Sequence, residues 1–420
     1  MNNARQTALD CLIRWDREKS YPNLLLAQKL EAFKNQTDRA FCARLVYGTI
    51  ERKITLDYYI AAMSSIPFRK IHIVTRNILR MGLYQIICLE VPASAACNTS
   101  VELAKKNGQS KSAGFVNAVL RRLADAYPTI QLPPPEDERF LSVRFSVDKT
   151  ICDLLCEQYG AVFAEQYFSA IEQMDTATAT AAVNLLKTDD ESLIALLKQE
   201  GVAAEVLTDG LLCLHLKTHP EHLTAYRQGL FHFIGRASYE AVRHLETEAG
   251  QTVVDCCSAP GGKLFAAAYR MRDKGEIFAI DIHEHKIALM RRQAQRLGID
   301  NITFICADAR QKLPDLIGRA DRVLCDVPCS GLGILQKKPD IRYKNMTDFS
   351  LTETQREILE NGLCYLKDGG KLIYSTCTVN REENERLLEK IPHIHIKDDR
   401  LFLPQTDQTD GFYWAEIEKA

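Results

Sequence analysis

The sequence predicts a multidomain α+β protein with an all-helical first domain, a small α/β subdomain and a C-terminal doubly wound α/β domain. Apolar residues recur at helical spacing over residues 4–130. A stiff proline-rich connector, Leu132-Pro133-Pro134-Pro135, follows that segment. From Gly250 onward, short apolar runs alternate with helical patterns, as in a doubly wound sheet. We place the domains at residues 1–135, 136–235 and 236–420.

The length and composition are those of an ordinary globular protein. A chain of 420 residues accommodates two or three domains, and 46% hydrophobic with 26% charged residues is typical of soluble proteins. No stretch approaches the roughly 20 apolar residues of a membrane span, and the N-terminus has no apolar signal core. We therefore expect a cytoplasmic protein with no membrane partner. We also expect a monomer, although composition does not determine the oligomeric state.

The 14 cysteines are scattered without the spacing of a disulfide framework. Free thiols in a reducing compartment are the expected state. Cys152 and Cys156 are four residues apart, and so are Cys325 and Cys329. Neither pair is accompanied by a second pair of metal ligands, so the sequence predicts no metal site.

Charge is unevenly distributed along the chain. Residues 1–130 contain 19 Lys and Arg against 10 Asp and Glu, a net of +9, so the remainder carries −11. A basic module joined to an acidic one suggests that the first module binds a polyanion, although a solvated basic surface is the alternative. The basic residues form two clusters: Arg69, Lys70, Arg76 and Arg80, then Lys105, Lys106, Lys111, Arg121 and Arg122.

Several helices and strands are expected before the C-terminal domain. In the first domain, helical patterns cover Asn23 to Phe33 and Ile73 to Ile87, among others. The small subdomain alternates helices and strands. Its expected helices are Val147 to Gly160 and Asp190 to Gly201, and its expected strands are Ala181 to Leu186 and Leu211 to Leu216.

A glycine turn, Asp255-Cys256-Cys257-Ser258-Ala259-Pro260-Gly261-Gly262-Lys263, joins the apolar run Thr252 to Val254 to a helical pattern that starts at Leu264. Strand, glycine turn and helix begin a nucleotide-binding, Rossmann-like unit. Glycines let the backbone approach a ligand because they carry no Cβ, and the first helical turn offers free N–H groups. A tight strand-to-helix turn without a ligand is the alternative.

Acidic residues stand at the ends of four successive apolar runs: Asp255, Asp281, Asp308 and Asp326. Ligands of open α/β sheets bind beyond the carboxyl ends of strands, so we expect these acids at one site. Asp281 follows the glycine turn by about twenty residues, where a ribose-binding carboxylate belongs. Helix capping is the alternative role for any one of them, Asp308 above all, but four in succession favour a site.

Two cysteines follow the fourth and fifth expected strands, Cys329 in Asp326-Val327-Pro328-Cys329-Ser330-Gly331 and Cys377 in Ser375-Thr376-Cys377-Thr378. If these strands are neighbours, about 4.8 Å apart, both thiols face one pocket. Buried cysteines are usually inert, but polar surroundings favour accessible, activated thiols. Carbon 5 of a pyrimidine, unlike an exocyclic amine, needs activation by thiolate addition at carbon 6, and a cysteine pair suits that cycle.

With these motifs the chain resembles the S-adenosylmethionine-dependent RNA cytosine-C5 methyltransferases, in particular the bacterial members that act on 16S ribosomal RNA and carry a NusB-like first domain. The resemblance covers nearly the whole chain. In the C-terminal domain it rests on the glycine turn, the two cysteine motifs and Glu382-Glu383-Asn384-Glu385. In the first domain its most specific element is Gly114-Phe115-Val116-Asn117-Ala118-Val119-Leu120-Arg121-Arg122.

This resemblance implies methyl transfer from S-adenosyl-L-methionine to carbon 5 of a cytosine in 16S ribosomal RNA, the expected partner. It implies Cys377 as the nucleophile, Cys329 as the group that assists product release, and Asp326 as the acid that orients the base. It also suggests that Lys263 and Arg342 hold a phosphate or the base. The implied cofactor-binding residues are Cys257, Ser258, Ala259, Pro260, Gly261, Gly262, Lys263, Asp281, Asp308 and Asp326.

The chain departs from the family pattern at Ala182, at Cys256 and in the segment Phe233 to Ser238. These departures affect the expected contacts with RNA more than the expected chemistry. Two alternative functions remain: a cytosine-C5 methyltransferase of transfer RNA or another ribosomal RNA site, and an RNA-binding assembly or antitermination factor with a vestigial catalytic domain. The two intact cysteine motifs disfavour the second. A dinucleotide dehydrogenase is disfavoured because Gly-x-Gly-x-x-Gly is absent.

Overall fold

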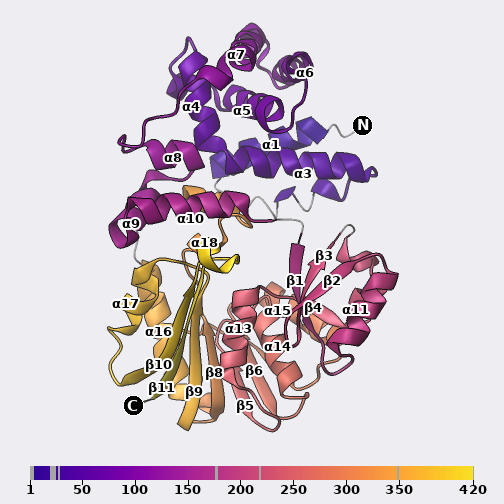
Figure 1. The fold of residues 1–420 in the computed structure, drawn as a ribbon, viewed down its shortest axis with the longest axis vertical. Coiled ribbons are helices and arrows are strands. Elements are labelled where there is room, and N and C mark those ends of the chain that lie inside the picture. Colours follow the sequence, from indigo (N-terminus) through magenta and orange to yellow (C-terminus); the bar gives the residue numbers. More distant parts are fainter. Residues whose placement is uncertain are drawn as a thin grey trace. The chain divides into compact units, whose positions relative to one another are not determined.

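The computed structural model of the chain describes residues 4–18, 25–26, 29–175, 178–216, 219–347 and 350–419 (Figure 1). The chain divides into two compact units. The first comprises residues 1–168 and 335–347, and the second comprises residues 169–334 and 348–420. The three-domain division at 135 and 235 stays a prediction. Within the described ranges, no helix is long and apolar enough to cross a membrane.

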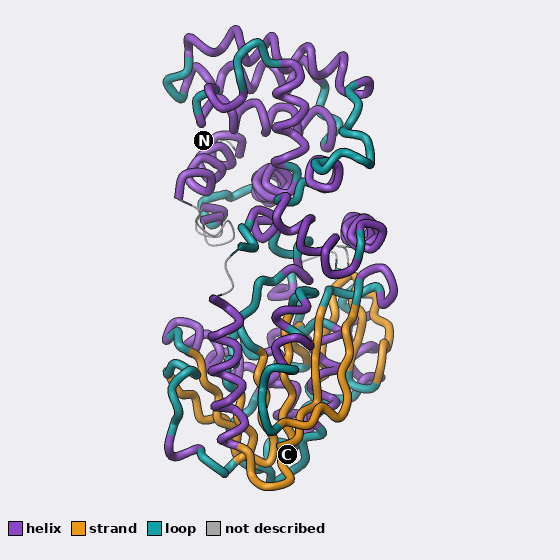
Figure 2. The backbone as a smooth tube through the Cα atoms, turned by 90° about the vertical axis from the view of Figure 1, so that its left-hand side faces the viewer, coloured by secondary structure: helices purple, strands orange, loops and turns teal. Residues whose placement is uncertain are grey.

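The first unit is helical, as the sequence predicts (Figures 1 and 2). The helix expected over Asn23 to Phe33 lies partly outside the described residues. A 3-10 turn from far along the sequence, η7 (Pro339–Tyr343), belongs to this unit, and the Tyr343 ring meets Trp15 edge-on at 5.8 Å between centroids. The longer helices are α1 (Ala4–Glu18), α3 (Gln36–Glu51), α4 (Lys53–Met63), α5 (Ile73–Cys88), α6 (Ala93–Lys106), α7 (Ala113–Ala126), α8 (Phe140–Phe145), α9 (Lys149–Tyr159) and α10 (Ala161–Gln173), whose end extends into the second unit.

Helix α5 is the central helix of the first unit, because every residue from Asn77 to Gln85 is buried. Its close packing requires a small residue. A Cβ on Gly82 would lie 2.7 Å from both the Leu120 side chain on α7 and the Ser100 hydroxyl on α6. A larger residue would therefore force these helices apart, which costs packing energy in a close-packed core.

Arg80, grouped by sequence with the phosphate-binding cluster, is instead a core residue. It is 2% exposed. Its guanidinium donates to both oxygens of Asp57 at 2.6 and 2.8 Å and to Asp16 at 2.9 Å. Burial alone would raise the pKa of Asp16, but the Arg80 charge lowers it below its ordinary value. The exposed members of the two basic clusters are Arg69, Lys70, Lys105, Lys106, Lys111, Arg121 and Arg122.

The smaller sheet of the second unit is antiparallel, with strand order β2-β3-β1-β4. Its strands are β1 (Thr178–Val183), β2 (Ala203–Thr208), β3 (Leu211–His215) and β4 (Phe231–Phe233). Helices α11 (Asp190–Gln199) and α12 (Thr224–Arg227) accompany it. The two predicted strands correspond to β1 and β3, and β2 and β4 are additional.

The larger sheet has strand order β10-β11-β9-β8-β5-β6-β7. Five parallel strands confirm the prediction: β5 (Thr252–Asp255), β6 (Glu276–Asp281), β7 (Ile302–Cys306), β8 (Ala320–Asp326) and β9 (Leu366–Thr376). An antiparallel pair, β10 (Ile394–Phe402) and β11 (Phe412–Lys419), extends the sheet beyond β9. The associated helices are α13 (Arg236–Leu245), α14 (Gly262–Arg270), α15 (Glu284–Leu297), α16 (Ser350–Tyr365), α17 (Glu385–Leu388) and α18 (Pro404–Asp407).

The strand order reverses at β5, which pairs with β6 on one side and β8 on the other. Strands β8 and β9 are parallel neighbours, as expected, with Asp326 opposite Ser375. Because parallel strands end at the same edge of a sheet, this pairing brings the loops after β5, β8 and β9 together. The site described below lies at that edge.

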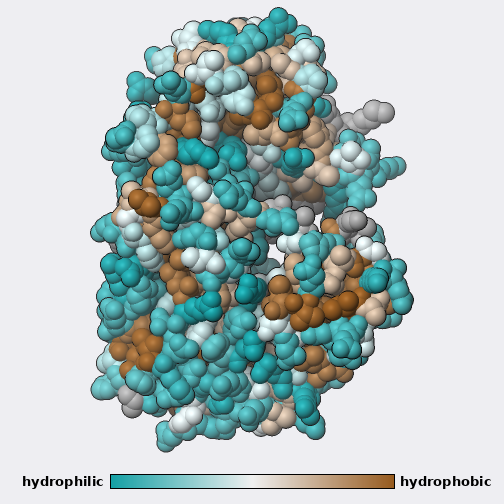
Figure 3. All heavy atoms as spheres, in the orientation of Figure 1, coloured by the Kyte–Doolittle hydropathy of each residue, from teal (hydrophilic) through white to brown (hydrophobic). Residues whose placement is uncertain are grey.

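Hydrophilic side chains predominate on the face of the protein shown in Figure 3, as expected for a chain with 26% charged residues. The large hydrophobic side chains exposed among the described residues are Ile66, Val162, Leu185, Val206, Leu207, Ile282, Leu289 and Ile317.

The Arg80→Met variant should lose about 3–5 kcal/mol of unfolding free energy at pH 7, because it removes the buried cation shared by Asp16 and Asp57 and leaves Asp57 only Lys53, at 3.7 Å. Urea denaturation measures the loss. The ion pair stabilises the fold above the ordinary pKa of an aspartate, and this stabilisation disappears as pH falls through the lowered pKa of Asp16. The difference between the variant and the parent should therefore shrink in acid.

A matched control is Arg14→Met, which removes an exposed ion pair with Glu18 at 2.8 Å. Such pairs contribute at most about 1 kcal/mol. Equal losses in the Arg14→Met and Arg80→Met proteins would contradict a core role for Arg80.

Candidate active site

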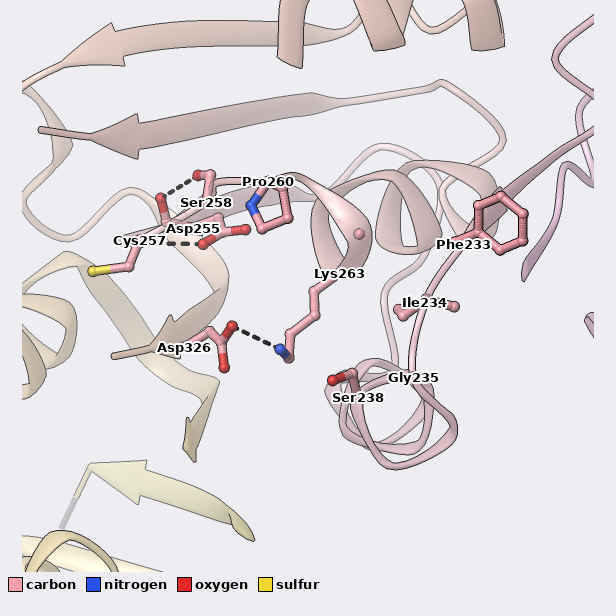
Figure 4. A pocket seen from close by; sticks show the side chains of 11 residues that line it. Phe233, Ile234, Gly235, Ser238, Asp255, Cys257, Ser258, Pro260, Lys263 and Asp326 are labelled. Carbon is pink, nitrogen blue, oxygen red and sulfur yellow. Dashed lines mark hydrogen bonds and ion pairs between the residues drawn. The ribbon is translucent and has the colours of Figure 1, made fainter. Parts of the chain in front are cut away.

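A cleft lies at the switch point of the larger sheet (Figure 4). It is open to solvent on one side and contains about 540 Å³ of space not filled by atoms. Its lining residues are Phe233, Ile234, Gly235, Ser238, Asp255, Cys257, Ser258, Pro260, Gly262, Lys263 and Asp326. Six of the ten expected cofactor residues are among them. The four that are not are Ala259, Gly261, Asp281 and Asp308.

The two glycines of the turn have different roles. Gly261 has φ of +101°, and a Cβ there would lie 2.6 Å from the Phe265 ring, so only glycine fits the backbone at this position. A Cβ on Gly262 would make only an ordinary 3.6 Å contact with the Phe233 carbonyl oxygen. The protein itself therefore tolerates a methyl group at Gly262. Because Gly262 carries no methyl group, the cleft stays open to a ligand.

Lys263 and Asp326 meet across the cleft (Figure 4). Lys263 Nζ lies 2.7 Å from Asp326 Oδ2, and the Ser375 hydroxyl donates to Asp326 Oδ1 at 2.8 Å. The Lys263 side chain is only 11% exposed, so it is not a solvated surface lysine. The ammonium group and the hydroxyl thus fix the orientation of the carboxylate.

Asp255 is a residue of this site. Its place at the end of a strand was predicted from the sequence, but its role was not. It lines the cleft, is 2% exposed and accepts a hydrogen bond from the Cys257 N–H at 3.3 Å. Burial and the Asp326 charge raise the pKa of Asp255 to about 7, against the opposing effect of Lys263. A carboxyl group that titrates near neutral pH beside a cleft is a candidate functional group.

Residues from β4 and α13 also line the cleft, namely Phe233, Ile234, Gly235 and Ser238. In the sequence this segment stands out only as a departure from the family pattern. No chemistry-bearing residue type marks it. Its contribution depends on the packing of α13 against α14 and β9, which sequence periodicity does not reveal.

The two cysteines named by the sequence are in contact. Cys329 Sγ and Cys377 Sγ are 3.2 Å apart, both residues are half-buried, and both are free thiols. The adjacent Cys377 thiol and burial raise the pKa of Cys329 well above its ordinary value. A raised pKa does not favour an activated thiol at Cys329, so activation of the two thiols stays a prediction.

Asp281 and Asp308 do not line the cleft, and each accepts hydrogen bonds from local groups. Asp281 is 8% exposed and accepts from the N–H groups of His283 at 2.9 Å and Ala259 at 3.3 Å. It thereby links the turns after β5 and β6. Asp308 accepts from the Arg310 N–H at 3.0 Å and from its guanidinium at 2.6 Å, and the guanidinium lowers the pKa of Asp308. This contact closes a turn, and the next helical element is η5 (Pro314–Leu316), so Asp308 does not cap a helix as the alternative had it.

Arg342, suggested by sequence to hold a phosphate or the base, belongs to the helical unit. It is 2% exposed, and its guanidinium donates to the Phe145 carbonyl oxygen at 2.9 Å. Its own carbonyl oxygen accepts from the Asp148 N–H at 2.7 Å. A side chain buried in this way does not reach an RNA phosphate, so the suggestion is wrong.

Two family models match the chain: 16S rRNA methyltransferase RsmB/F over residues 242–418, and the NusB family over residues 2–125. A curated relative, the probable ribosomal RNA small subunit methyltransferase B of Bacillus subtilis (strain 168), is 31% identical over 99% of this chain and 99% of its own length. The ribosomal RNA small subunit methyltransferase B of Vibrio cholerae serotype O1 is 29% identical over 91% of this chain and 90% of its own.

Solved structures share the fold. The crystal structure of PH0851 matches 99% of both chains with a TM-score of 0.80 at 21% identity. The structure of NSun6 from Pyrococcus horikoshii with SFG covers 65% of this chain and 98% of its own with a TM-score of 0.60 at 22% identity.

Removing the carboxyl group of Asp255 should change how stability depends on pH. Because its folded pKa of about 7 lies above the ordinary value of 3.8, the protonated form stabilises the fold, and this contribution disappears as pH rises toward 7. Between pH 5 and 8 the unfolding free energy of the parent should fall by on the order of 2–3 kcal/mol because of this group. Thermal melts of Asp255→Asn should no longer show this fall in stability with rising pH. The exposed Glu276→Gln control should still show it. A parent-like slope in Asp255→Asn would refute the assignment.

Proposed function

Because this chain belongs to the 16S rRNA methyltransferase RsmB/F family, we propose that it transfers a methyl group from S-adenosyl-L-methionine to carbon 5 of a specific cytosine in 16S ribosomal RNA through a covalent cysteine–cytosine intermediate. The observation that carries this proposal is the 3.2 Å separation of Cys329 Sγ and Cys377 Sγ. Two thiols in contact, beside the oriented carboxylate of Asp326, suit an addition and elimination cycle on a pyrimidine.

The cleft residues fit the proposed cofactor, which supplies an electrophilic methyl group on a positively charged sulfur. Two acids, Asp255 and Asp326, line the cleft with one cation, Lys263, so a cationic ligand is favoured there. We assign the turn Cys257 to Lys263 to the methionine part. The Asp281 carboxylate uses two of its acceptor sites on backbone N–H groups, and its remaining lone pairs would accept the ribose hydroxyls.

We assign two further cofactor contacts by family resemblance. Asp308 would lie beside the adenine, and Asp326 would contact both cofactor and base. The NSun6 structure, which was determined with SFG, shares the fold of this chain at 22% sequence identity.

In the proposed reaction the Cys377 thiolate adds to carbon 6 of the cytosine. The new S–C6 bond displaces the electrons of the C5–C6 double bond, and carbon 5 becomes nucleophilic. Asp326 hydrogen-bonds the edge of the base. After methylation a base removes the proton from carbon 5, the double bond reforms and the Cys377 thiolate leaves. Cys329, protonated because its pKa is raised, donates its S–H toward the departing sulfur.

The target cytosine must leave its stack to reach the cysteines, as single-stranded or splayed RNA permits. The helical first domain would supply affinity for the RNA backbone. Its exposed basic residues would neutralise phosphates and release counterions, so binding should weaken as salt rises.

Cofactor binding should depend on Asp281. Asp281→Ala should weaken S-adenosylmethionine binding at least about tenfold in titration calorimetry, because a carboxylate that accepts hydroxyl hydrogen bonds contributes roughly 1.5–3 kcal/mol. Glu284→Ala, in the first turn of α15, is the nearby control and should bind normally. An absence of binding by the parent protein would instead favour the vestigial RNA-binding factor.

The two cysteines should give different phenotypes. Cys329→Ala should accumulate a covalent protein–RNA adduct, visible as a shifted band in denaturing gels, because release of the product is impaired. Cys377→Ala should abolish methylation and form no adduct. Cys213→Ala, on the smaller sheet, is the control and should retain activity. Full activity in Cys377→Ala would refute the mechanism.

Bisulfite sequencing of RNA from a deletion strain identifies the substrate. Loss of one 5-methylcytosine in 16S ribosomal RNA is expected. Loss of a site in transfer RNA or in another ribosomal RNA would support the alternative substrate.

A further inference from the structure

A buried carboxylate lies between the two cysteine loops. Glu383, in the turn η8 (Arg381–Glu383), is 2% exposed. Its contacts within the described residues are to neutral donors. Oε2 accepts from the Ser330 N–H at 2.8 Å and from Gln355 Nε2 at 2.9 Å, and Oε1 accepts from Asn380 Nδ2 at 2.9 Å.

From these contacts we infer that Glu383 is a positioning residue, whose carboxylate ties the loop of Cys329 to the loop of Cys377 and holds the two sulfur atoms together. The inference deepens the function proposed above and rests on it for its catalytic meaning. The geometry that it describes can be measured without RNA or cofactor.

The loop of Cys329 is held on both sides of the cysteine. Ser330, the residue after it, donates its N–H to Glu383. Pro328, the residue before it, accepts at its carbonyl oxygen from the Gln355 amide at 2.9 Å, and the same amide nitrogen donates to Glu383. One carboxylate and one amide therefore fix the backbone on either side of Cys329.

The loop of Cys377 is held by the same turn. Asn380 donates its side-chain amide to Glu383, and the Tyr374 hydroxyl donates to the Glu383 carbonyl oxygen at 2.7 Å. A direct link joins the loops where the Ser330 and Thr378 hydroxyls meet at 2.7 Å. Residues next to both cysteines are thus connected within one buried network.

The network needs an acceptor-only group at position 383. A carboxylate accepts hydrogen bonds at both oxygens, and bonds to an ionised acceptor are about twice as strong as neutral ones. Glutamine has the same shape but one acceptor oxygen, so its amide nitrogen would face at least one of the three donors. Leaving a buried donor unpaired costs about 1–3 kcal/mol. The negative charge of Glu383 also raises the pKa of Cys329. Its effect is smaller than those of the Cys377 thiol and of burial.

The first test compares Glu383→Gln with Glu382→Gln. Glu382 is the adjacent acid in the same turn, but it pairs with Arg386 at 2.7 Å and Lys390 at 3.4 Å on the surface. We expect Glu383→Gln to lower kcat for methylation by about 10- to 100-fold, since a misplacement of about 1 Å has this effect on reacting groups. The KM for S-adenosylmethionine should stay within about twofold, because Glu383 is not a cleft residue. Glu382→Gln should match the parent.

The second test measures the proximity of the thiols directly. Diamide oxidises two thiols to one disulfide, and the two electrons and two protons reduce its azo bond to a hydrazine. Peptide mapping then follows the Cys329–Cys377 crosslink in the full chain without RNA. The parent and Glu382→Gln should crosslink rapidly, because their sulfur atoms are 3.2 Å apart. Glu383→Gln should crosslink at least about tenfold more slowly.

Each outcome decides the inference. Parent-like crosslinking together with parent-like kcat in Glu383→Gln would overturn it. Slow crosslinking in a chain that methylates no RNA would support the positioning role and refute the proposed function. If Glu383→Gln fails to fold, Gln355→Met carries the test, because it removes the amide shared by Pro328 and Glu383 while retaining side-chain volume. It should slow crosslinking in the same direction, and an unchanged rate would overturn the inference.

Discussion

The parallel pairing of β8 with β9 determines where the acid and the two thiols of the proposed chemistry lie. Asp326 ends β8 opposite Ser375 of β9, so the Ser375 hydroxyl reaches the Asp326 carboxylate at 2.8 Å. The residues that follow each strand leave the sheet at the same edge, and their cysteines meet at 3.2 Å. A slip of this register by one residue would direct side chains to the opposite face. The pairing of two strands therefore places the acid and the thiol pair at one edge of the sheet.

Charge in the cleft is unbalanced in a way that suits a cation. Asp255 and Asp326 are both acids, and Lys263 binds only Asp326 directly, at 2.7 Å. The remaining negative charge is relieved by partial protonation, which is why burial and Asp326 raise the pKa of Asp255 to about 7. A positively charged ligand would relieve the same repulsion without a proton. In the proposed function, cofactor binding and proton release from Asp255 would therefore be coupled.

Sequence patterns could predict the parts of the fold that have strong local periodicity or motifs. The five parallel strands, the glycine turn and the proximity of Cys329 and Cys377 follow from apolar runs and from the rule that ligands gather at strand ends. Burial is a property of the folded chain, so the sequence could not predict that Arg80 and Arg342 are core residues. The antiparallel strands β10 and β11 were missed because they have no motif, and the role of Asp255 was missed because it depends on neighbours distant in sequence.

The two cysteines differ in electrostatic surroundings, and that difference supports distinct roles for chemically identical groups. Glu383 holds the backbone after Cys329 at 2.8 Å through the Ser330 N–H, and its negative charge opposes ionisation of Cys329. A second thiolate 3.2 Å from the first would be repelled, so the pair favours a single negative charge. In the proposed function Cys377 would carry that charge as the nucleophile, and the neutral S–H of Cys329 would remain beside it to stabilise the thiolate when it leaves. In the proposed function, the network that positions the thiols would therefore also favour the proton on Cys329.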